Sequence, residues 1–232
     1  MMSFPDNFRA VVFGASGGLG GAFSDILRQD GRCGHLVELS RRSNPPIDLE
    51  NEAALLAAAE HLAPQGPFHL LIDATGILHA PGIQPEKSLT AVDPVQVARV
   101  MQINATGPLL LLKHFAPLLA KDERSVFASL SARVGSIGDN ELGGWYAYRA
   151  SKAALNMMLK TASIEIARKR PHNVCLALHP GTVVTELSEP FAGKRMRLSP
   201  QESAARMLRV IDKAEPAETG SFFAYDGSKI EW

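Results

Sequence analysis

The chain has 232 residues, of which 46% are hydrophobic and 21% charged, which suits one globular domain with a large buried core. Lysine plus arginine and aspartate plus glutamate both number 24, and no basic stripe stands out, which argues against nucleic acid or an anionic membrane as a partner. No apolar run approaches the ~18 residues of a membrane span, and the first residues lack the apolar core of a secretory signal, so we expect a cytoplasmic protein.

Short apolar runs alternate with longer helical patterns along the chain. Strands are expected at residues 10–13, 36–39, 70–73, 126–129, 174–178 and 222–225. Helices are expected at residues 19–29, 50–63, 94–105, 108–119, 148–168 and 200–212, and surface loops at 81–85 and 188–197. Continuous apolar runs bounded by turn residues are typical of buried parallel strands. The alternation therefore predicts an α/β fold, a doubly wound parallel sheet with helices on both faces, in a single domain over residues 1–232.

Two helix starts and the cysteines add detail to this prediction. Asp93 precedes a proline as an N-cap, and Ser199 begins a capping box. Cys33 and Cys175 have no metal-ligand spacing, and the seven histidines form no metal motif, so we expect no metal. Two buried free thiols are expected, with a disulfide between them as the alternative.

A glycine-rich turn follows the first predicted strand and opens the first predicted helix. Its spacing is GxxxGxG, and no Lys-Ser or Lys-Thr pair follows, which excludes a Walker P-loop. Glycine lets the backbone approach a pyrophosphate closely, and a helix N-terminus offers free N–H groups. A tight turn without a ligand is the alternative. We expect this turn to bind the phosphates of a dinucleotide through Gly14, Ser16, Gly18, Leu19 and Gly20.

The end of the second predicted strand indicates which dinucleotide binds. An acid at this position bonds the ribose 2′-hydroxyl of NAD, whereas a nearby arginine accommodates the 2′-phosphate of NADP. Here Ser40 takes the place of the acid, Arg41 and Arg42 follow, and Glu38 is expected to point away from the ribose. The sequence therefore favours NADP(H), bound by Arg41. The residues expected at the adenine edge are Asp48 and Leu49.

A tyrosine and a lysine form the expected catalytic pair. Tyr148 and Lys152 are four residues apart in a predicted helix, so they share one face. A nearby ammonium favours the phenolate, and we expect it to lower the pKa of Tyr148 from about 10. Such a phenol serves as general acid in carbonyl reduction or as general base in alcohol oxidation. We expect Ser131 to donate a hydrogen bond to the substrate oxygen, and Asn104 to break a helix and hold a water relay to Lys152.

The segment after the predicted strand at 174–178 lies where a nicotinamide would bind. Its backbone and the side chain of Thr185 are expected to fix the carboxamide. The residues of this segment that we expect at the cofactor are Pro180, Gly181, Val183 and Thr185.

Taken in order, these motifs resemble those of the short-chain dehydrogenase/reductase family along nearly the whole chain. The segments 131–137, 143–156 and 220–227 are similar to the subgroup of sniffer-type carbonyl reductases and bacterial C-factor-like proteins. The resemblance implies a Rossmann-like sheet, a homodimer or homotetramer, and a catalytic tetrad. The tetrad consists of Asn104, Ser131, Tyr148 and Lys152.

Three departures from the family pattern stand out. Phe13 replaces a threonine that often opens the glycine motif. Residues 73–76 read Asp-Ala-Thr-Gly where Asn-Asn-Ala-Gly is usual, so two side chains that brace the central sheet are expected to be missing. Ser131 lies four residues before Gly135, where three is usual, so Ala132 is the alternative occupant of the serine position. Three residues of the second motif are still expected at the cofactor, namely Ala74, Thr75 and Gly76.

Together these patterns predict an NADP(H)-dependent oxidoreductase that acts on a small-molecule carbonyl or alcohol. The rival hypothesis is a dinucleotide-binding signalling or scaffold protein whose redox chemistry is vestigial. A purely structural dimer without a ligand leaves the glycine turn unexplained.

Overall fold

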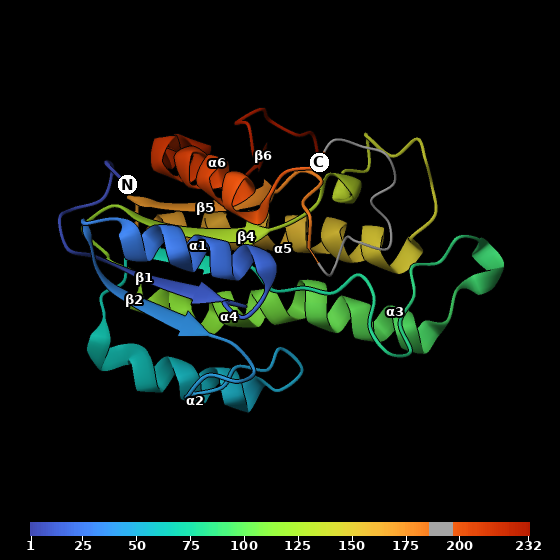
Figure 1. Ribbon diagram of the computed structural model, residues 1–232, viewed down its shortest axis with the longest axis horizontal. Helices are drawn as coiled ribbons and strands as arrows, with labels where there is room; N and C mark the ends of the chain where they lie inside the picture. The colour runs from blue at the N-terminus through green and yellow to red at the C-terminus, as the bar shows by residue number, and fades with distance from the viewer. Residues whose placement is uncertain (186–196) are drawn as a thin grey trace.

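The computed structural model describes residues 1–185 and 197–232, and its centre is one parallel sheet (Figure 1). The strand order is β2-β1-β3-β4-β5-β6. The strands are β1 (Phe8–Phe13), β2 (Cys33–Leu39), β3 (Leu70–Asp73), β4 (Ser125–Leu130), β5 (Asn173–His179) and β6 (Ser221–Ala224). All six predicted strands are confirmed, with β2 beginning at Cys33 instead of residue 36. Strands β3, β4 and β5 are almost wholly buried, as their continuous apolar runs predicted.

Helices cover both faces of the sheet, as Figure 1 shows. The helices are α1 (Gly18–Gln29), α2 (Glu52–Leu62), α3 (Pro94–Met101), α4 (Gly107–Phe115), α5 (Tyr146–Lys169) and α6 (Pro200–Lys213). The helices α1 and α6 pack with alternate strand residues in one hydrophobic cluster, and α2, α4 and α5 pack with the other residues in a second cluster. The predicted α/β fold with a doubly wound sheet is therefore confirmed. Most of the predicted loop at 188–197 lies outside the described residues.

Both N-caps that the sequence predicted are found, but the capping box predicted at Ser199 is only half formed. The Asp93 carboxylate accepts the N–H of Val95 at the start of α3 (2.8 Å). The Ser199 hydroxyl accepts the N–H of Glu202 at the start of α6 (3.1 Å). The predicted capping box also needs the Glu202 carboxylate to turn back, but this group pairs with Arg206 at 2.6 Å. The Glu202 carboxylate thus pairs with an arginine one turn along the helix, and the second hydrogen bond of the capping box is not formed.

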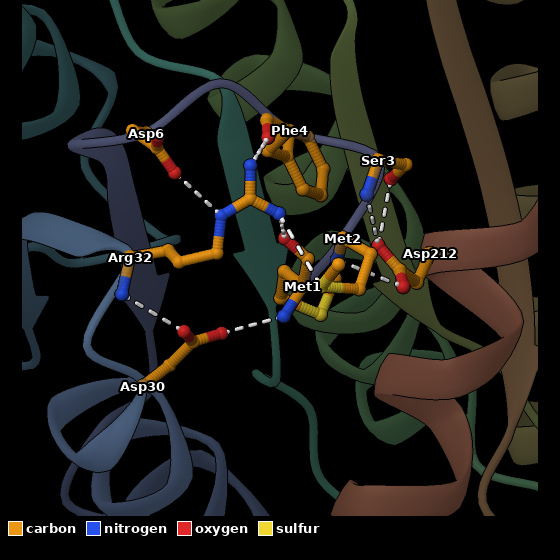
Figure 2. A network of polar contacts seen from close by, with 8 residues as sticks. All are labelled: Met1, Met2, Ser3, Phe4, Asp6, Asp30, Arg32 and Asp212. Atoms are coloured by element: carbon orange, nitrogen blue, oxygen red, sulfur yellow. Dashed lines mark hydrogen bonds and ion pairs between the residues drawn. The ribbon is translucent and has the colours of Figure 1, made fainter.

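The start of the chain is tied to two elements at the amino ends of the strands (Figure 2). Asp212 of α6 accepts hydrogen bonds from the N–H and the hydroxyl of Ser3, at 2.9 and 2.7 Å. Arg32, just before β2, donates to the carboxylate of Asp6 and to the carbonyl of Phe4, at 2.8 and 2.6 Å. These bonds join the α1–β2 turn to α6 and leave the carboxyl ends of the strands open for a site.

Two further expectations concern the thiols and the membrane. Both cysteines are free, so the alternative of a disulfide is wrong, and Cys175 is buried whereas Cys33 is half-buried. No helix in the described parts of the chain is both long and apolar enough to cross a membrane.

Candidate active site

The glycine turn has the close contacts that only glycine permits. Gly14 has a φ of +79°, and a Cβ there would lie 2.9 Å from the carbonyl oxygen of Ala74. A side chain at Gly20 would overlap the Gly14 carbonyl. Helix α1 begins at Gly18, and its N-cap, Gly17, provides no side-chain cap. The first N–H groups of α1 are therefore available to an anion, so this turn fits a pyrophosphate.

Two arginines with unengaged guanidinium groups follow β2. Arg41 and Arg42 are exposed, and neither side chain makes a hydrogen bond or ion pair with the described residues. Glu38 pairs with Arg28 of α1 at 2.8 Å, so its carboxylate is directed at α1. The end of β2 therefore presents two cations, and the carboxylate of Glu38 is already paired with α1.

The expected adenine-edge residues lie on the loop that leads to α2. Asp48 is exposed and its carboxylate accepts the N–H of Glu50 at 3.0 Å. Leu49 is buried against Gly107, where α4 begins. The leucine therefore fixes this loop on the helical layer, while the carboxylate stays accessible.

The segments that follow β3 and β5 both contact the glycine turn. Gly76, with a φ of +140°, lies after β3, and Gly181, with a φ of +79°, lies after β5. A Cβ on Gly18 would lie 3.1 Å from the Cγ2 atom of Thr185. The hydroxyl of Ser203 donates to the Pro180 carbonyl at 2.7 Å, which ties the β5 end to α6. The segments predicted to bind phosphate and nicotinamide are thus in contact.

Helix α5 presents Tyr148 and Lys152 to the strand ends. The Lys152 ammonium is buried and donates to the carbonyl of Leu130 at 2.8 Å. The Tyr148 hydroxyl makes no hydrogen bond with the described residues, and its ring meets that of Trp145 edge to face, with centroids 6.1 Å apart. The phenol is therefore available to a substrate.

The pKa shifts of this pair differ from the expectation. Burial raises the pKa of Tyr148 to about 12. Burial also lowers the pKa of Lys152 to about 8, and the Asp73 carboxylate acts against that lowering. The expected lowering of the tyrosine pKa is wrong for the protein by itself, because the ammonium is bonded to Leu130 and desolvation of the phenolate dominates.

Asn104 lies in a π-helical turn, Gln102–Thr106, that joins α3 to α4. The predicted break between two helices is thus a local widening within one continuous helical segment. The side-chain amide accepts from the N–H of Ile77 (2.7 Å) and donates to its carbonyl (2.8 Å) and to the hydroxyl of Ser151 (3.2 Å). Both N–H donors of the amide are engaged, whereas Oδ1 accepts one of these bonds and keeps a second lone pair that could accept from a relay water.

Ser131 is buried at the end of β4 and donates its hydroxyl hydrogen to the Oδ1 atom of Asn156 at 2.6 Å. In this state the hydroxyl can accept from a substrate but cannot donate to it. Ala132, half-buried, follows directly. Asn156 lies on the same face of α5 as Tyr148 and Lys152, two turns after the tyrosine, and its Nδ2 atom is buried without a partner.

Comparisons with known proteins agree with this geometry. A family model described as "Enoyl-(Acyl carrier protein) reductase" matches residues 22–230. The chain belongs to the short-chain dehydrogenase/reductase family. One relative is 1-hydroxy-2-glutathionyl-2-methyl-3-butene dehydrogenase of Rhodococcus sp. (strain AD45), 32% identical over 81% of this chain and 79% of the relative. Another is C-signal of Myxococcus xanthus, 38% identical over 72% of this chain and 94% of the relative.

Solved structures of the family have the same fold. Carbonyl reductase Sniffer of D. melanogaster superposes with a TM-score of 0.83, at 26% identity, over 98% of this chain and 100% of that one. The NADPH-bound carbonyl reductase from chicken fatty liver gives a TM-score of 0.84, at 24% identity, over 98% and 100%. The resemblance to sniffer-type and C-factor-like members is thereby confirmed, and the chain is an oxidoreductase of the short-chain dehydrogenase/reductase family.

Three polar residues in this region were given no role from the sequence. The Asp73 carboxylate accepts a hydrogen bond from the Ser129 hydroxyl of β4 at 2.6 Å. Residues 73 and 74 were expected to lack side chains that brace the sheet, and for Asp73 this expectation is wrong. His179 ends β5 with a buried, unpartnered Nδ1 atom, and burial lowers its pKa to about 4. Glu86 contacts the start of α5. The contacts of Asp73 with Ser129 and of Glu86 with Ala147 join residues far apart in the sequence, so no local signal marks them.

One groove lies apart from this site. It has a volume of about 550 Å³ and is lined by residues of α6, of β6 and of the turn after β6, including Arg206, Arg209 and Tyr225. It contains none of the predicted site residues. No group of three or more His, Cys, Asp or Glu side chains in the described part of the chain could hold a metal ion.

Proposed function

We propose that the protein reduces a carbonyl compound with NADPH, and that Tyr148 donates the proton to the carbonyl oxygen. The observation that carries the proposal is an unengaged phenol next to a buried ammonium on one face of α5. The hydroxyl of Tyr148 has no partner in the described residues, and Lys152 is fixed one turn later by the Leu130 carbonyl. A proton donor and a fixed positive charge are what the reduction of a carbonyl oxygen requires.

The division of roles follows from the two side chains. A bound NADPH supplies hydride to the carbonyl carbon. Tyr148 keeps its proton near neutral pH, because burial raises its pKa to about 12, and gives it up as negative charge develops on the substrate oxygen. The Lys152 ammonium stabilises the resulting phenolate. Only one of its three N–H groups is engaged by Leu130, so the others can donate to hydroxyls of a cofactor ribose.

The preference for NADP(H) over NAD(H) is part of this proposal. It is supported by the unengaged Arg41 and Arg42 and by the pairing of Glu38 with Arg28. A similar structure is described as NADPH-bound. An arginine beside a phosphate makes strong, charge-assisted hydrogen bonds. The other proposed cofactor contacts are those expected from the sequence, from the glycine turn to Thr185.

A second candidate function is a dinucleotide-binding signalling or scaffold protein with vestigial redox chemistry. Two observations favour it. The similarity to the protein named C-signal covers 94% of that protein. The hydroxyl of Ser131 is bonded to Asn156, so this member of the expected tetrad is not free to donate.

The experiment compares Tyr148→Phe with Tyr146→Phe, a control on the same helix whose ring is 40% exposed. NADPH oxidation is followed against a panel of aldehydes, ketones and quinones. We expect Tyr148→Phe to lower kcat by roughly 10²–10⁴-fold, with NADPH affinity changed by less than about threefold because the phenol makes at most one neutral contact. Tyr146→Phe should behave as wild type.

Two results separate the candidates. Turnover by Tyr148→Phe at the wild-type rate would show that another group donates the proton. Tight NADPH binding by the wild type, without reduction of any compound in the panel, would favour the signalling or scaffold function.

A further inference from the structure

Asp73 is a buried carboxylate at the floor of the proposed site. It ends β3 and is 1% exposed. One oxygen accepts from the hydroxyl and the N–H of Thr75, and the other accepts from the hydroxyl of Ser129 at 2.6 Å. All three donors are neutral. A buried carboxylate is costly unless a positive charge lies near it, so its surroundings are informative.

The charged group that acts on Asp73 is the Lys152 ammonium, which is anchored to β4 at the residue after Ser129. Lys152 is 4% exposed and bonds the carbonyl of Leu130, and Ser129, which bonds Asp73, directly precedes Leu130. The turn that begins at Asp73 continues past the ammonium, because a Cβ on Gly76 would lie 3.4 Å from Nζ. The two charges are thus held by separate hydrogen bonds and do not touch.

Their interaction is electrostatic and nearly isolated from other charges. Burial lowers the pKa of Lys152 to about 8, and Asp73 is the charged group that opposes this lowering. Burial raises the pKa of Asp73, and the bonds from Ser129 and Thr75 and the Lys152 charge oppose the rise. Tyr148 on α5 is neutral below its raised pKa. At the ends of β4 and β5, burial and then the charge of Arg133 lower the pKa of His179 to about 4, so this residue is neutral at pH 7.

We propose that Asp73 is a positioning residue for Lys152, and that its buried carboxylate keeps the ammonium charged beside Tyr148 at neutral and mildly alkaline pH. The proposal rests on the proposed function for its catalytic consequence, but the charge interaction itself does not. It also accounts for a departure of this sequence, because the asparagine usual at this position has the same shape without the charge. The mechanism needs a charged Lys152, and a nearby carboxylate opposes the loss of the proton that burial favours.

The test measures Lys152 directly in protein without cofactor. The protein is labelled with lysine carrying ¹³C at Cε, and the Lys152 signal is assigned from its loss in Lys152→Met and titrated by NMR. In Asp73→Asn we expect the midpoint to fall by about one pH unit or more, the usual effect of losing an opposite charge at short range. Ser129→Ala is the matched control, since it removes a bond to the carboxylate and keeps the charge. Its midpoint should stay near that of wild type.

The pH profile of NADPH-dependent reduction is the second readout. The active form carries the Lys152 proton, so activity is lost as pH rises through the lysine pKa. In Asp73→Asn this alkaline limb should move to lower pH by the same interval, with activity near wild type at pH 6. A merely structural role of Asp73 would lower activity at every pH and leave the limb in place.

The outcomes are distinguishable. An unchanged Lys152 midpoint in Asp73→Asn overturns the inference, whatever the activity. A lowered midpoint in a protein whose wild type reduces no carbonyl supports the charge interaction and overturns the proposed function. If Asp73→Asn does not fold, the smaller neutral variant Asp73→Ser takes its place, with the same shift expected.

Discussion

Arg41 shows at the scale of one residue how a sequence signal becomes a testable contact. The Arg41 guanidinium makes no hydrogen bond or ion pair within the described residues, so none of those bonds must break when it turns to a ligand phosphate. Charge-assisted hydrogen bonds of this kind are worth about 1.5–3 kcal/mol. We therefore expect NADPH to bind at least about tenfold more tightly than NADH.

Replacing the arginine should erase most of that difference. We expect Arg41→Ala to weaken NADPH binding by about tenfold or more and to change NADH binding by less than about threefold, because NADH has no 2′-phosphate. Fluorescence titration of both nucleotides measures this. Arg168→Ala, which removes an exposed positive charge at the end of α5, is the control for net charge. Equal affinity of the wild type for both nucleotides would contradict the prediction.

Some properties of single residues could be predicted from the sequence and others could not. The glycine turn could be, because Gly20 must approach the backbone of Gly14 within the turn itself, although the contact of Gly14 with Ala74 comes from the fold. The bond from Ser131 to Asn156 could not, because it depends on how α5 lies against β4. The direction of the Tyr148 pKa was also missed, since spacing along a helix gives the nearest charge but not the extent of burial.

Helix α5 shows, at the scale of one element, that contacts made by distant residues cannot be predicted from the local sequence. The sequence predicted a helix at residues 148–168 and the structure has it at Tyr146–Lys169, but the cap of its N-terminus was not predicted. The N-cap, Trp145, has a left-handed backbone with a φ of 54° and provides no side-chain cap. The cap comes instead from Glu86 in a distant loop, whose carboxylate accepts the N–H of Ala147 at 3.2 Å and the amide of Gln96 at 2.9 Å. No local sequence signal marks such a cap.

We expect Glu86 to hold the turn of α5 that carries Tyr148. Glu86→Ala should lower the free energy of unfolding by about 1–2 kcal/mol, the usual value of an N-cap. It should also lower kcat while NADPH affinity changes little, because Ala147 adjoins the tyrosine. Glu86→Gln keeps an acceptor oxygen, so its free energy of unfolding and its kcat should lie between those of wild type and Glu86→Ala.

Thermal unfolding and steady-state kinetics measure these effects. Glu141→Ala, an exposed acid in the loop before α5, is the control and should match wild type. Unchanged stability in Glu86→Ala would show that water caps the helix equally well.

The continuous helical segment from α3 to α4 shows why the boundaries of helices are harder to predict than the helices themselves. Two helices were expected, ending at residue 105 and restarting at 108. The structure instead continues through the π-helical turn Gln102–Thr106. A π turn keeps the backbone hydrogen-bonded while it shifts the register of side chains. This shift gives Asn104 its contacts with Ile77 and Ser151, which belong to other elements.

At the scale of the whole molecule, the alternation of strands and helices predicted the layers but not the order β2-β1-β3-β4-β5-β6. The order decides which strand ends are neighbours. It places β3 between β1 and β4, so Asp73 lies between the glycine turn and Ser129. The site is thus a product of topology, and the amino ends of the strands are closed by bonds such as that of Ser3 to Asp212 (Figure 2).

The outer face of α5 carries the prediction for assembly. Met157 and Ile164, two turns apart on α5, are 68% and 49% exposed. Apolar side chains at this spacing form a stripe along one face of a helix, and a two-fold axis would bring the stripe against its copy. We expect a homodimer or homotetramer in which α4 and α5 pair with their copies, so that the scattering mass is two or four times 25.0 kDa.

A charge in the middle of that stripe should separate the subunits. In Met157→Glu two like charges would meet near the axis, and each would lose water without gaining a partner, so we expect the dissociation constant to rise by at least about tenfold. Light scattering at micromolar concentration measures the mass. Leu89→Glu places the same charge at a site that is 73% exposed and lies in the turn before α3, away from α5, and should leave the assembly intact. A wild-type mass of 25.0 kDa at that concentration would show that the stripe does not mediate assembly.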